Sequence, residues 1–339
     1  MQSRKLKNVL LLLAILFVAF LFFSYWYMME CEGNWRGESL ETKMKMELIE
    51  IKKNMESDIE YLQKLGPRNS ENDESYKQLR QCEDWIRQKW ESQGYVVKKY
   101  TYSVKGKEYS NLEIEIKGRI TPAEIIIISA QYDTLPDSPG ANNNGSGVAI
   151  LFQLSQLLRK HTPDRTLRLL NFVNEEDPFF GTEMMGSYQY AKRSHQLRED
   201  IKVMLSLDAL GVYKNEPNSQ RLPFPFSLFY PDRGNFLAFI GNFPSRKYMV
   251  EVSKGFKKGS SFPIEVGVAP EWAEGAAWSD HSSFWKFGYP GIMVTDTGGF
   301  RSPYHTTKED TMEKLNFEAM SRIVIGMYAC AVHLTSLQK

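Results

Sequence analysis

The chain begins with a long apolar stretch, which covers residues 9–29 without one charged side chain. A helix of about 20 apolar residues spans the hydrocarbon core of a bilayer, so this stretch predicts a transmembrane anchor. Basic side chains precede it at Arg4, Lys5 and Lys7. Because positive charge marks the cytoplasmic side, we expect residues 1–8 to be a cytoplasmic tail. The body of the chain would then be exported, to the periplasmic or extracellular side.

A cleaved signal peptide is the alternative interpretation of this stretch. Cleavage requires small residues after the apolar run, whereas here Tyr25, Trp26 and Tyr27 are followed by two methionines. The residues before Cys31 also lack the small side chains expected at a lipoprotein cleavage site. An uncleaved, single-pass anchor is therefore favoured, and aromatic rings of this kind suit the far membrane interface.

Regular hydrophobic spacing follows a short polar segment, residues 30–45, which predicts a linker. Apolar residues at helical intervals predict helices over 46–64 and 74–93. Two runs of alternating apolar and polar residues, 95–104 and 111–118, predict half-buried strands.

Four nearly continuous apolar runs predict strands that are buried on both faces. These runs are 125–130, 166–173, 203–207 and 290–295. Helices are expected over 147–160 and 315–334. Because strands alternate with helices, the expected fold class is α/β, a three-layer sandwich with a mostly parallel central sheet. The Pro-, Gly- and aromatic-rich region 214–275 is interpreted as an insertion or lid within one domain over 46–339.

Composition narrows the functional classes. The 339 residues are 42% hydrophobic and 24% charged, which excludes a disordered chain. A net charge of +1 argues against nucleic acid as a partner. The widely spaced Cys31, Cys82 and Cys330 form no metal-binding pair. Histidine is scarce, with five in the chain, so any histidine-containing metal site has few candidates.

Polar side chains follow the predicted strands at the points where ligands bind in open α/β sheets. Gln131 and Asp133 follow the first buried run, Glu175 and Glu176 the second, and Asp208 the third. Each has a simpler alternative, since a glutamate pair is usually a solvated surface feature and a lone aspartate is often a helix cap. The convergence of several strand ends is what favours a functional site.

Three further segments carry candidate chemistry. Asn143 lies in a glycine-rich loop that would also be explained as a turn before a helix. Asp280 and His281 stand together before the fourth run, and Tyr304 and His305 follow it. Either histidine, taken alone, is as well explained by a structural role.

Taken together, these motifs resemble the M28 family of zinc aminopeptidases. The resemblance covers about residues 48–335, and the motifs follow in the order and spacing of the family. They lie at 65–69, 111–118, 130–149, 174–177, 205–211, 279–284 and 304–311. The resemblance implies a zinc aminopeptidase-like (phosphorylase/hydrolase-like) fold and the hydrolysis of peptides at their N-terminal residues.

The resemblance also implies a two-zinc centre with five ligand positions. Carried over to this chain, these positions are Gln131, Asn143, Glu176, Asp208 and His305. Glu175 is implied as the general base, and Asp133 as the catalytic carboxylate that supports the first ligand from behind. Asp280, His281 and Tyr304 are implied to lie close to the site or in the substrate pocket.

Two ligand positions depart from the family pattern, because Gln131 replaces a histidine and Asn143 replaces the aspartate that bridges both metals. A neutral carboxamide is a weaker zinc ligand than imidazole or carboxylate. Two Zn²⁺ ions about 3.5–4 Å apart repel by roughly 17–19 kcal/mol at an effective dielectric constant of 20, which a bridging carboxylate offsets and an amide does not. We therefore expect one zinc ion rather than two.

Two functions remain open. The first is a membrane-anchored M28-type metallopeptidase with a weakened site, which acts on peptides or similar small molecules. The second is a catalytically inactive relative that keeps the pocket for binding. A cyclase acting on N-terminal glutamine, a reaction known from one-zinc relatives, is a third possibility. Core packing is the simpler interpretation of Trp272, Trp278, Phe300 and Tyr304, which are also candidates for an apolar specificity pocket.

Overall fold

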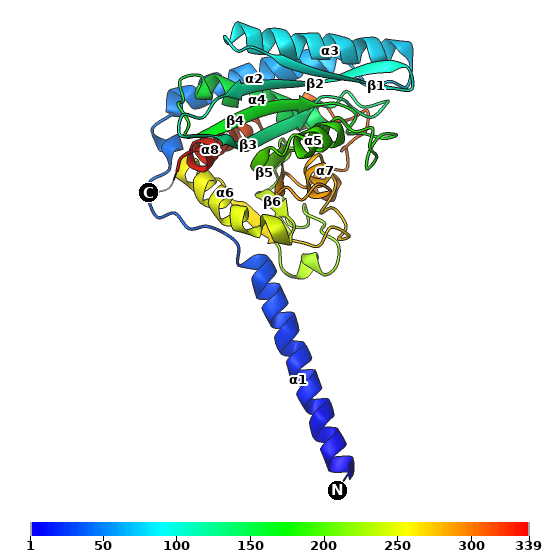
Figure 1. Cartoon of the computed structure of the whole chain (residues 1–339), viewed down its shortest axis with the longest axis vertical. Helices are drawn as coiled ribbons and strands as arrows, with labels where there is room; N and C mark the ends of the chain where they lie inside the picture. The colour runs from blue at the N-terminus through cyan, green and yellow to red at the C-terminus, as the bar shows by residue number, and fades with distance from the viewer. Residues whose placement is uncertain (1, 338–339) are drawn as a thin grey trace.

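The structure is a computed structural model that describes residues 2–337, with side chains from Lys7 onward. The basic side chains of Arg4 and Lys5, which belong to the expected cytoplasmic tail, lie outside the described residues, as do residues 338–339. One domain sits at the end of a long, isolated N-terminal helix (Figure 1).

A single eight-stranded sheet runs through the domain in the order β1-β2-β4-β3-β5-β8-β6-β7. Four of its neighbouring pairs are parallel, β3 with β4 and with β5, β5 with β8, and β6 with β7. The other three pairs are antiparallel. The strands are β1 Lys98–Val104, β2 Lys107–Ile116, β3 Thr121–Gln131, β4 Arg165–Phe172, β5 Asp200–Leu207, β6 Leu237–Gly241, β7 Ile264–Val268 and β8 Gly291–Thr295.

Helices cover both faces of the sheet, which makes the fold a three-layer α/β sandwich as expected (Figure 1). They are α1 Gln2–Met29, α2 Lys45–Leu65, α3 Asp73–Ser92, α4 Gly147–Leu158, α5 Gly186–Gln196, α6 Arg246–Gly259, α7 His281–Trp285 and α8 Phe317–Thr335. Alternation along β3 explains the two cores. Ile126 and Ile128 pack with residues of α2, α4, α6 and α8, whereas Ile125 and Ile127 pack with residues of α5 and α7.

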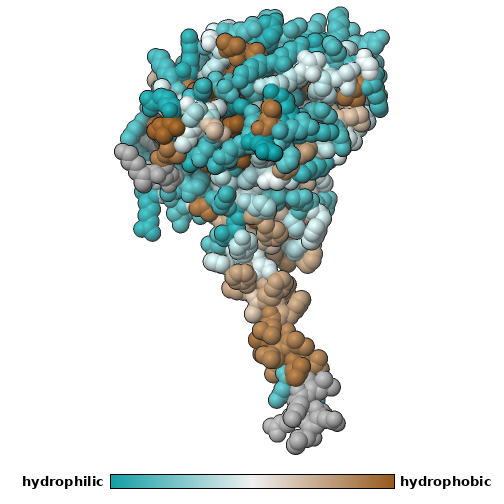
Figure 2. Space-filling view, viewed as in Figure 1, coloured by the Kyte–Doolittle hydropathy of each residue, from teal (hydrophilic) through white to brown (hydrophobic). Residues whose placement is uncertain are grey.

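Among residues 2–337, two helices are long and apolar enough to cross a membrane, by length and composition. The apolar window of the segment Lys7–Met29 in α1 contains no buried residue, whereas α8 is mostly buried among the helices of the domain. Burial identifies α8 as a core helix. The exposed α1 therefore suggests that the chain is anchored in a membrane, and Figure 2 shows its brown, apolar surface projecting from a largely hydrophilic domain.

The segment after the anchor, residues 30–45, is packed against the domain. Cys31 is fully buried, and the Gly33 amide donates a hydrogen bond of 2.7 Å to Ser253 Oγ on α6. Glu41 lies in a short 3₁₀ turn, Leu40–Thr42, and is 8% exposed. The connection between anchor and domain is therefore held in place by specific contacts.

The region 214–275, interpreted as an insertion or lid, is not a lid over residues 237–268. These residues supply β6, α6 and β7, and β6 pairs directly with β8 in the central sheet. The two strands are short, and β6 ends on Gly241, so their apolar runs resemble loop sequence. Helices α5 and α7 were also not expected from the hydrophobic pattern.

Candidate active site

The strand ends bring the expected polar residues together at one edge of the sheet. Gln131 is the last residue of β3, Glu175 and Glu176 follow β4, and Asp208 follows β5. Asn143 lies in the turn Ala141–Ser146 that leads into α4. Parallel strands end at the same edge of the sheet, which is why residues so distant in sequence meet.

The two substituted positions are joined by hydrogen bonds. Gln131 Nε2 lies 3.4 Å from Asn143 Oδ1 and 3.4 Å from Glu175 Oε2, and it donates to both. Asn143 Nδ2 donates to Glu176 Oε1 at 2.5 Å. The Gln131 side chain also acts to lower the pKa of Asp208. Carboxamide N–H groups therefore occupy carboxylate oxygens that would otherwise face a cation.

Asn144, which the motif comparison did not single out, completes this network. Its Nδ2 donates to Gln131 Oε1 at 2.5 Å and to the Leu207 carbonyl at 2.7 Å. Gln131 Oε1 is the atom of this side chain best suited to bind a metal, and the hydrogen bond from Asn144 already occupies it. Asn144 directly follows Asn143 in the chain, but the amino-acid sequence alone does not predict that its side chain bonds to Gln131.

Two buried carboxylates fix the backbone around the site. Asp133 accepts the amide N–H groups of Glu175 and Glu176 at 3.2 and 3.1 Å. Asp310 accepts the amide N–H groups of Asn142 and Asn143, both at 2.9 Å. Asp133 thus acts on backbone positions. The role of Asp310 was missed, although it lies within the motif at 304–311.

The buried Arg68 holds the same loops from behind. Its guanidinium donates to the carbonyls of Tyr132 at 3.0 Å and Pro139 at 2.9 Å. Its charge also faces Asp133 and Asp310. This side chain therefore ties the end of β3 to the loop that presents Asn143.

Burial and clustered negative charge dominate the electrostatics. Burial raises the pKa of Glu175 well above its ordinary value, and the nearby Asp208 and Glu176 raise it further. The pKa of Glu176 is raised well above its ordinary value for the same reasons, burial first and Asp133 next. Burial also raises the pKa of Asp208 to about 6. Carboxyl groups that are buried close together are stabilised either by protonation or by a bound cation.

His305 lies at the open side of this cluster. It lines the same cavity as Asp208, and its Nδ1 is buried with no hydrogen-bond partner among residues 2–337. Burial lowers the pKa of His305, which favours the neutral imidazole. A neutral imidazole nitrogen without a partner is suited to bind a metal ion.

The other expected neighbours differ in their contacts. Asp280 is fully buried at the start of α7, and the charges of Asp133 and Asp208 act on it. His281 Nε2 lies 2.8 Å from the Ala276 carbonyl, so it supports the local loop. The ring of Tyr304 lies under the Lys314 ammonium, 4.5 Å from the ring centre. His281 and Tyr304 therefore make structural contacts.

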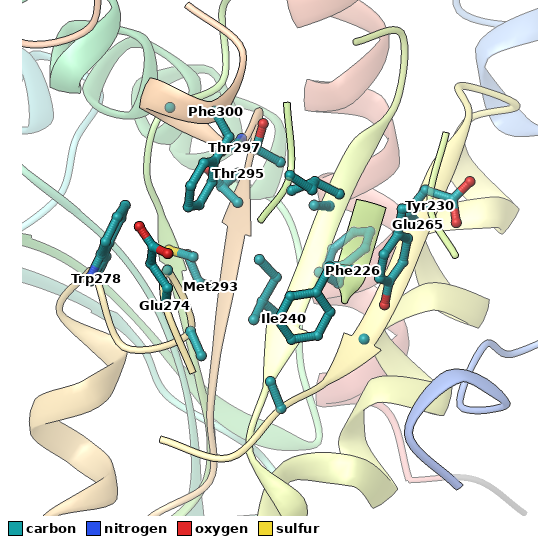
Figure 3. Close-up of a pocket in the computed structure, with 18 of the residues that line it drawn as sticks. Phe226, Tyr230, Ile240, Glu265, Glu274, Trp278, Met293, Thr295, Thr297 and Phe300 are labelled. Carbon is teal, nitrogen blue, oxygen red and sulfur yellow. Dashed lines mark hydrogen bonds between the residues drawn. The ribbon is translucent and has the colours of Figure 1, made fainter. Parts of the chain in front are cut away.

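An apolar cavity of about 190 Å³ adjoins Asp208 and His305. Trp278 and Phe300 line it and stack with their ring centres 5.3 Å apart. In Figure 3, Trp278 and Glu274 lie on one side of the cavity and Tyr230 and Glu265 on the other. Trp272, another candidate for this pocket, is 87% exposed.

The described side chains form no ready-made zinc site. Among residues 2–337, no three His, Cys, Asp or Glu side chains are arranged so that they could hold a metal ion. The remaining zinc donors by chemistry are Glu176, Asp208 and His305. Glu176 accepts an amide hydrogen bond from Asn143, which it must release before it binds an ion.

Buried carboxylates, an imidazole and an apolar cavity at the strand ends of an α/β sheet define a hydrolase-like site. A sequence model of peptidase family M28 matches residues 111–330. The chain therefore belongs to the M28 family of zinc peptidases. Membership confirms the family and the fold expected from the motifs, and it implies zinc and hydrolase chemistry.

Individual relatives agree with this assignment. The chain is 31% identical over 283 residues to the uncharacterized protein YfbL of Escherichia coli strain K12, covering 80% of this chain and 85% of YfbL. It is 24% identical over 314 residues to a probable zinc metalloprotease of Pyrenophora teres f. teres, covering 80% of this chain and 64% of that protein. The LapA aminopeptidase of Legionella pneumophila has the same fold, with a TM-score of 0.66 and 18% identity, covering 91% of this chain and 78% of LapA.

Proposed function

We propose that the chain is an M28-type metallopeptidase that hydrolyses peptides outside the cytoplasm with a weakened, one-zinc site. The observation that carries the proposal is the set of hydrogen bonds from Gln131 to Glu175 and from Asn143 to Glu176. It leaves an acidic, imidazole-containing site of the family in place but replaces the ligands that a second metal requires.

In this proposal Glu176, Asp208 and His305 would hold the ion. Zinc, when bound, polarises a carbonyl and lowers the pKa of water. Glu175 accepts the proton of the attacking water and passes it to the leaving amine. Asp133 keeps Glu175 and Glu176 in position through their backbone amides. The adjoining apolar cavity would take the side chain of the N-terminal residue.

The anchor completes the proposal. The exposed apolar segment Lys7–Met29 would cross the membrane once, with the N-terminus in the cytoplasm and the catalytic domain on the opposite side. Peptide substrates would then be met outside the cytoplasm.

Restoring the family ligands tests the weakened site. The full chain is purified in lipid nanodiscs, bound zinc is measured, and hydrolysis of aminoacyl-anilides is followed. We expect at most one zinc per native chain, and two zinc ions with at least a hundredfold higher kcat/KM for the double variant Gln131→His, Asn143→Asp. Gln81→His, on an exposed position of α3, controls for an added histidine. Two zinc ions bound to the native chain would contradict the proposal.

A catalytically inactive, peptide-binding relative is the second candidate. The observation that favours it is that Asn144 and Glu175 also bond to Gln131, so this carboxamide has partners for its oxygen and its nitrogen without a metal. The same experiment separates the two candidates. No hydrolysis by the native chain at saturating zinc, with activity restored in the double variant, would establish the inactive form. An N-terminal glutamine peptide included in the assay tests cyclisation.

A further inference from the structure

The apolar cavity beside the candidate active site extends to the end of the membrane anchor. Asp208 and His305 line it at one end, and Met28 and Met29, the last two residues of α1, also line it. Its lining therefore combines the catalytic edge of the sheet with the point where the chain leaves the proposed membrane span.

The floor of this cavity is the exposed side of the last three strands. Ala238 and Ile240 come from β6, Gly267 from β7 and Met293 from β8. Alternate residues of the same strands pack against α6 in the main core. The cavity floor is thus an apolar strip that leads from the catalytic edge across β8, β6 and β7 (Figure 3).

The loop that covers this strip exposes large apolar side chains beside the anchor. Phe224 is 80% exposed and Leu228 is 67% exposed. The ring of Phe229 packs against that of Tyr25 of α1, tilted by 42°, with ring centres 4.5 Å apart. In Figure 2 the apolar surface of the anchor continues into pale brown residues at the base of the domain. Aromatic and aliphatic side chains in this position suit a membrane interface.

Specific contacts fix the anchor against the domain at this place. Arg246 Nε donates to the Tyr27 carbonyl at 2.8 Å, and its guanidinium lies 4.3 Å from the Tyr27 ring centre. Arg246 Nη2 donates to the Glu30 carbonyl at 2.8 Å, and Glu32 forms an ion pair with Lys257. The cavity opening beside Met28 and Met29 is therefore held at the membrane surface.

We propose that this cavity is a channel for a long aliphatic chain that enters from the bilayer surface. The substrate would be an amphiphile with such a chain on the carbonyl side of its scissile amide, so that the chain lies along β6 and β7 while the amide reaches Asp208 and His305. This inference rests on the proposed function for the reaction and on the anchor for the direction of entry.

The chemistry of the lining favours an aliphatic occupant. Burial raises the pKa of Glu265 to about 7, and the charge of Glu32 adds to the effect. The acid near the membrane end is thus partly neutral at physiological pH and carries little charge to repel a hydrocarbon chain. Glu274, beside Trp278 at the other end, is placed to meet a polar head group (Figure 3).

Photolabelling of the full chain in phospholipid nanodiscs tests the channel without requiring zinc or hydrolysis. The probe is 2-aminodecanoic acid with a diazirine in its side chain, and a probe with a three-carbon side chain serves as the short control. Labelled peptides are mapped by mass spectrometry. We expect the long probe to label 222–240, 264–278 and Met28–Met29 at least tenfold more than the short one, and excess unlabelled 2-aminodecanoic acid to suppress the labelling.

Two variants sharpen the test. Ala238→Phe fills the channel floor and should reduce labelling at least fivefold, whereas Ala123→Phe, at an exposed position of β3, should not. Phe224→Ser with Leu228→Ser should slow labelling at least threefold if the chain enters through lipid. If excess unlabelled 2-aminodecanoic acid does not suppress the labelling, the channel is overturned, even if the peptidase is active. Unchanged labelling of the serine variant would overturn entry from the bilayer.

Discussion

At the scale of single residues, two carboxamides decide what the site can bind. Gln131 and Asn143 have nearly the shape of ligands but present N–H groups to Glu175 and Glu176. These N–H groups satisfy carboxylates that would otherwise need a cation or a proton. In the proposed function, the carboxamide of Gln131 in place of an imidazole and that of Asn143 in place of a carboxylate would change the metal chemistry of the site without changing the fold around it.

Another carboxylate, Glu41, illustrates how hydrogen bonds control ionisation far from the site. Burial alone would raise its pKa, but hydrogen bonds from Arg322, Ser260 and Ser261 outweigh burial and lower the pKa to about 2. Because the folded-state pKa lies below the ordinary value, the ionised carboxylate stabilises the fold above about pH 5. This stabilisation is lost as the pH falls toward 2.

Glu41→Gln should therefore lower the free energy of unfolding by about 2–3 kcal/mol at pH 7, because the amide cannot accept all of these bonds. The difference from the native chain should shrink between pH 5 and pH 2. Chemical denaturation across this range measures both effects. Glu38→Gln, whose side chain is 61% exposed, is the matched control and should change stability little at any pH.

At the scale of elements, the short strands β6 and β7 determine how far the sheet extends. β6 pairs antiparallel with β8, and β7 pairs parallel with β6, so both belong to the sheet rather than to a lid. Phe239 of β6 is fully buried, with its ring centre 5.6 Å from that of Phe256 on α6.

Two phenylalanines of the region 214–275 should therefore behave in opposite ways. Phe239→Ala should cost about 3–5 kcal/mol, because it leaves a cavity in the core. Phe224→Ala should change the free energy of unfolding by less than about 0.5 kcal/mol, because Phe224 is 80% exposed. Thermal or urea unfolding measures both. Equal, small effects would show that β6 lies outside the cooperative core.

At the scale of the whole molecule, one helix and one domain are joined by a fixed connection. Arg246, Lys257 and Ser253 of α6 hold the residues that follow α1. The orientation of the domain relative to the proposed membrane is thus part of the structure. Met28 and Met29 of the anchor helix line the cavity, and Phe229, in the same loop as Phe224 and Leu228, packs against Tyr25 of that helix.

Cysteine labelling tests which side of the membrane the domain occupies. The native cysteines Cys31, Cys82 and Cys330 are buried, and burial raises the pKa of each thiol, so background labelling should be low. A membrane-impermeant maleimide should label Lys308→Cys, at an exposed position, in intact cells or right-side-out vesicles. Lys7→Cys should react only after permeabilisation. The opposite pattern would reverse the proposed topology.

Much of the architecture follows from local sequence. The continuous apolar runs of β3, β4 and β5 predict buried strands. Successive side chains of a strand point to opposite faces of the sheet, so a strand that is apolar at every position must be covered by helices on both faces. The strand-end rule then predicts that Gln131, Glu175 and Asp208 lie at one edge. Neither inference needs distant contacts, because each depends on the hydrophobic pattern and on strand direction.

The remaining features depend on tertiary contacts that no local pattern carries. The partner of β6 is β8, some 50 residues later in the chain, and a five-residue apolar run does not specify that pairing. The hydrogen bonds of Asn144 to Gln131 and of Asp310 to the Asn143 amide join segments that are separate in sequence. The sequence by itself determined the apolar N-terminal helix and the α/β class, and it predicts which ligand positions lack a metal donor. Only the tertiary structure decided that carboxamides occupy the remaining carboxylates and that the apolar cavity reaches the anchor, because both depend on which side chains meet after folding.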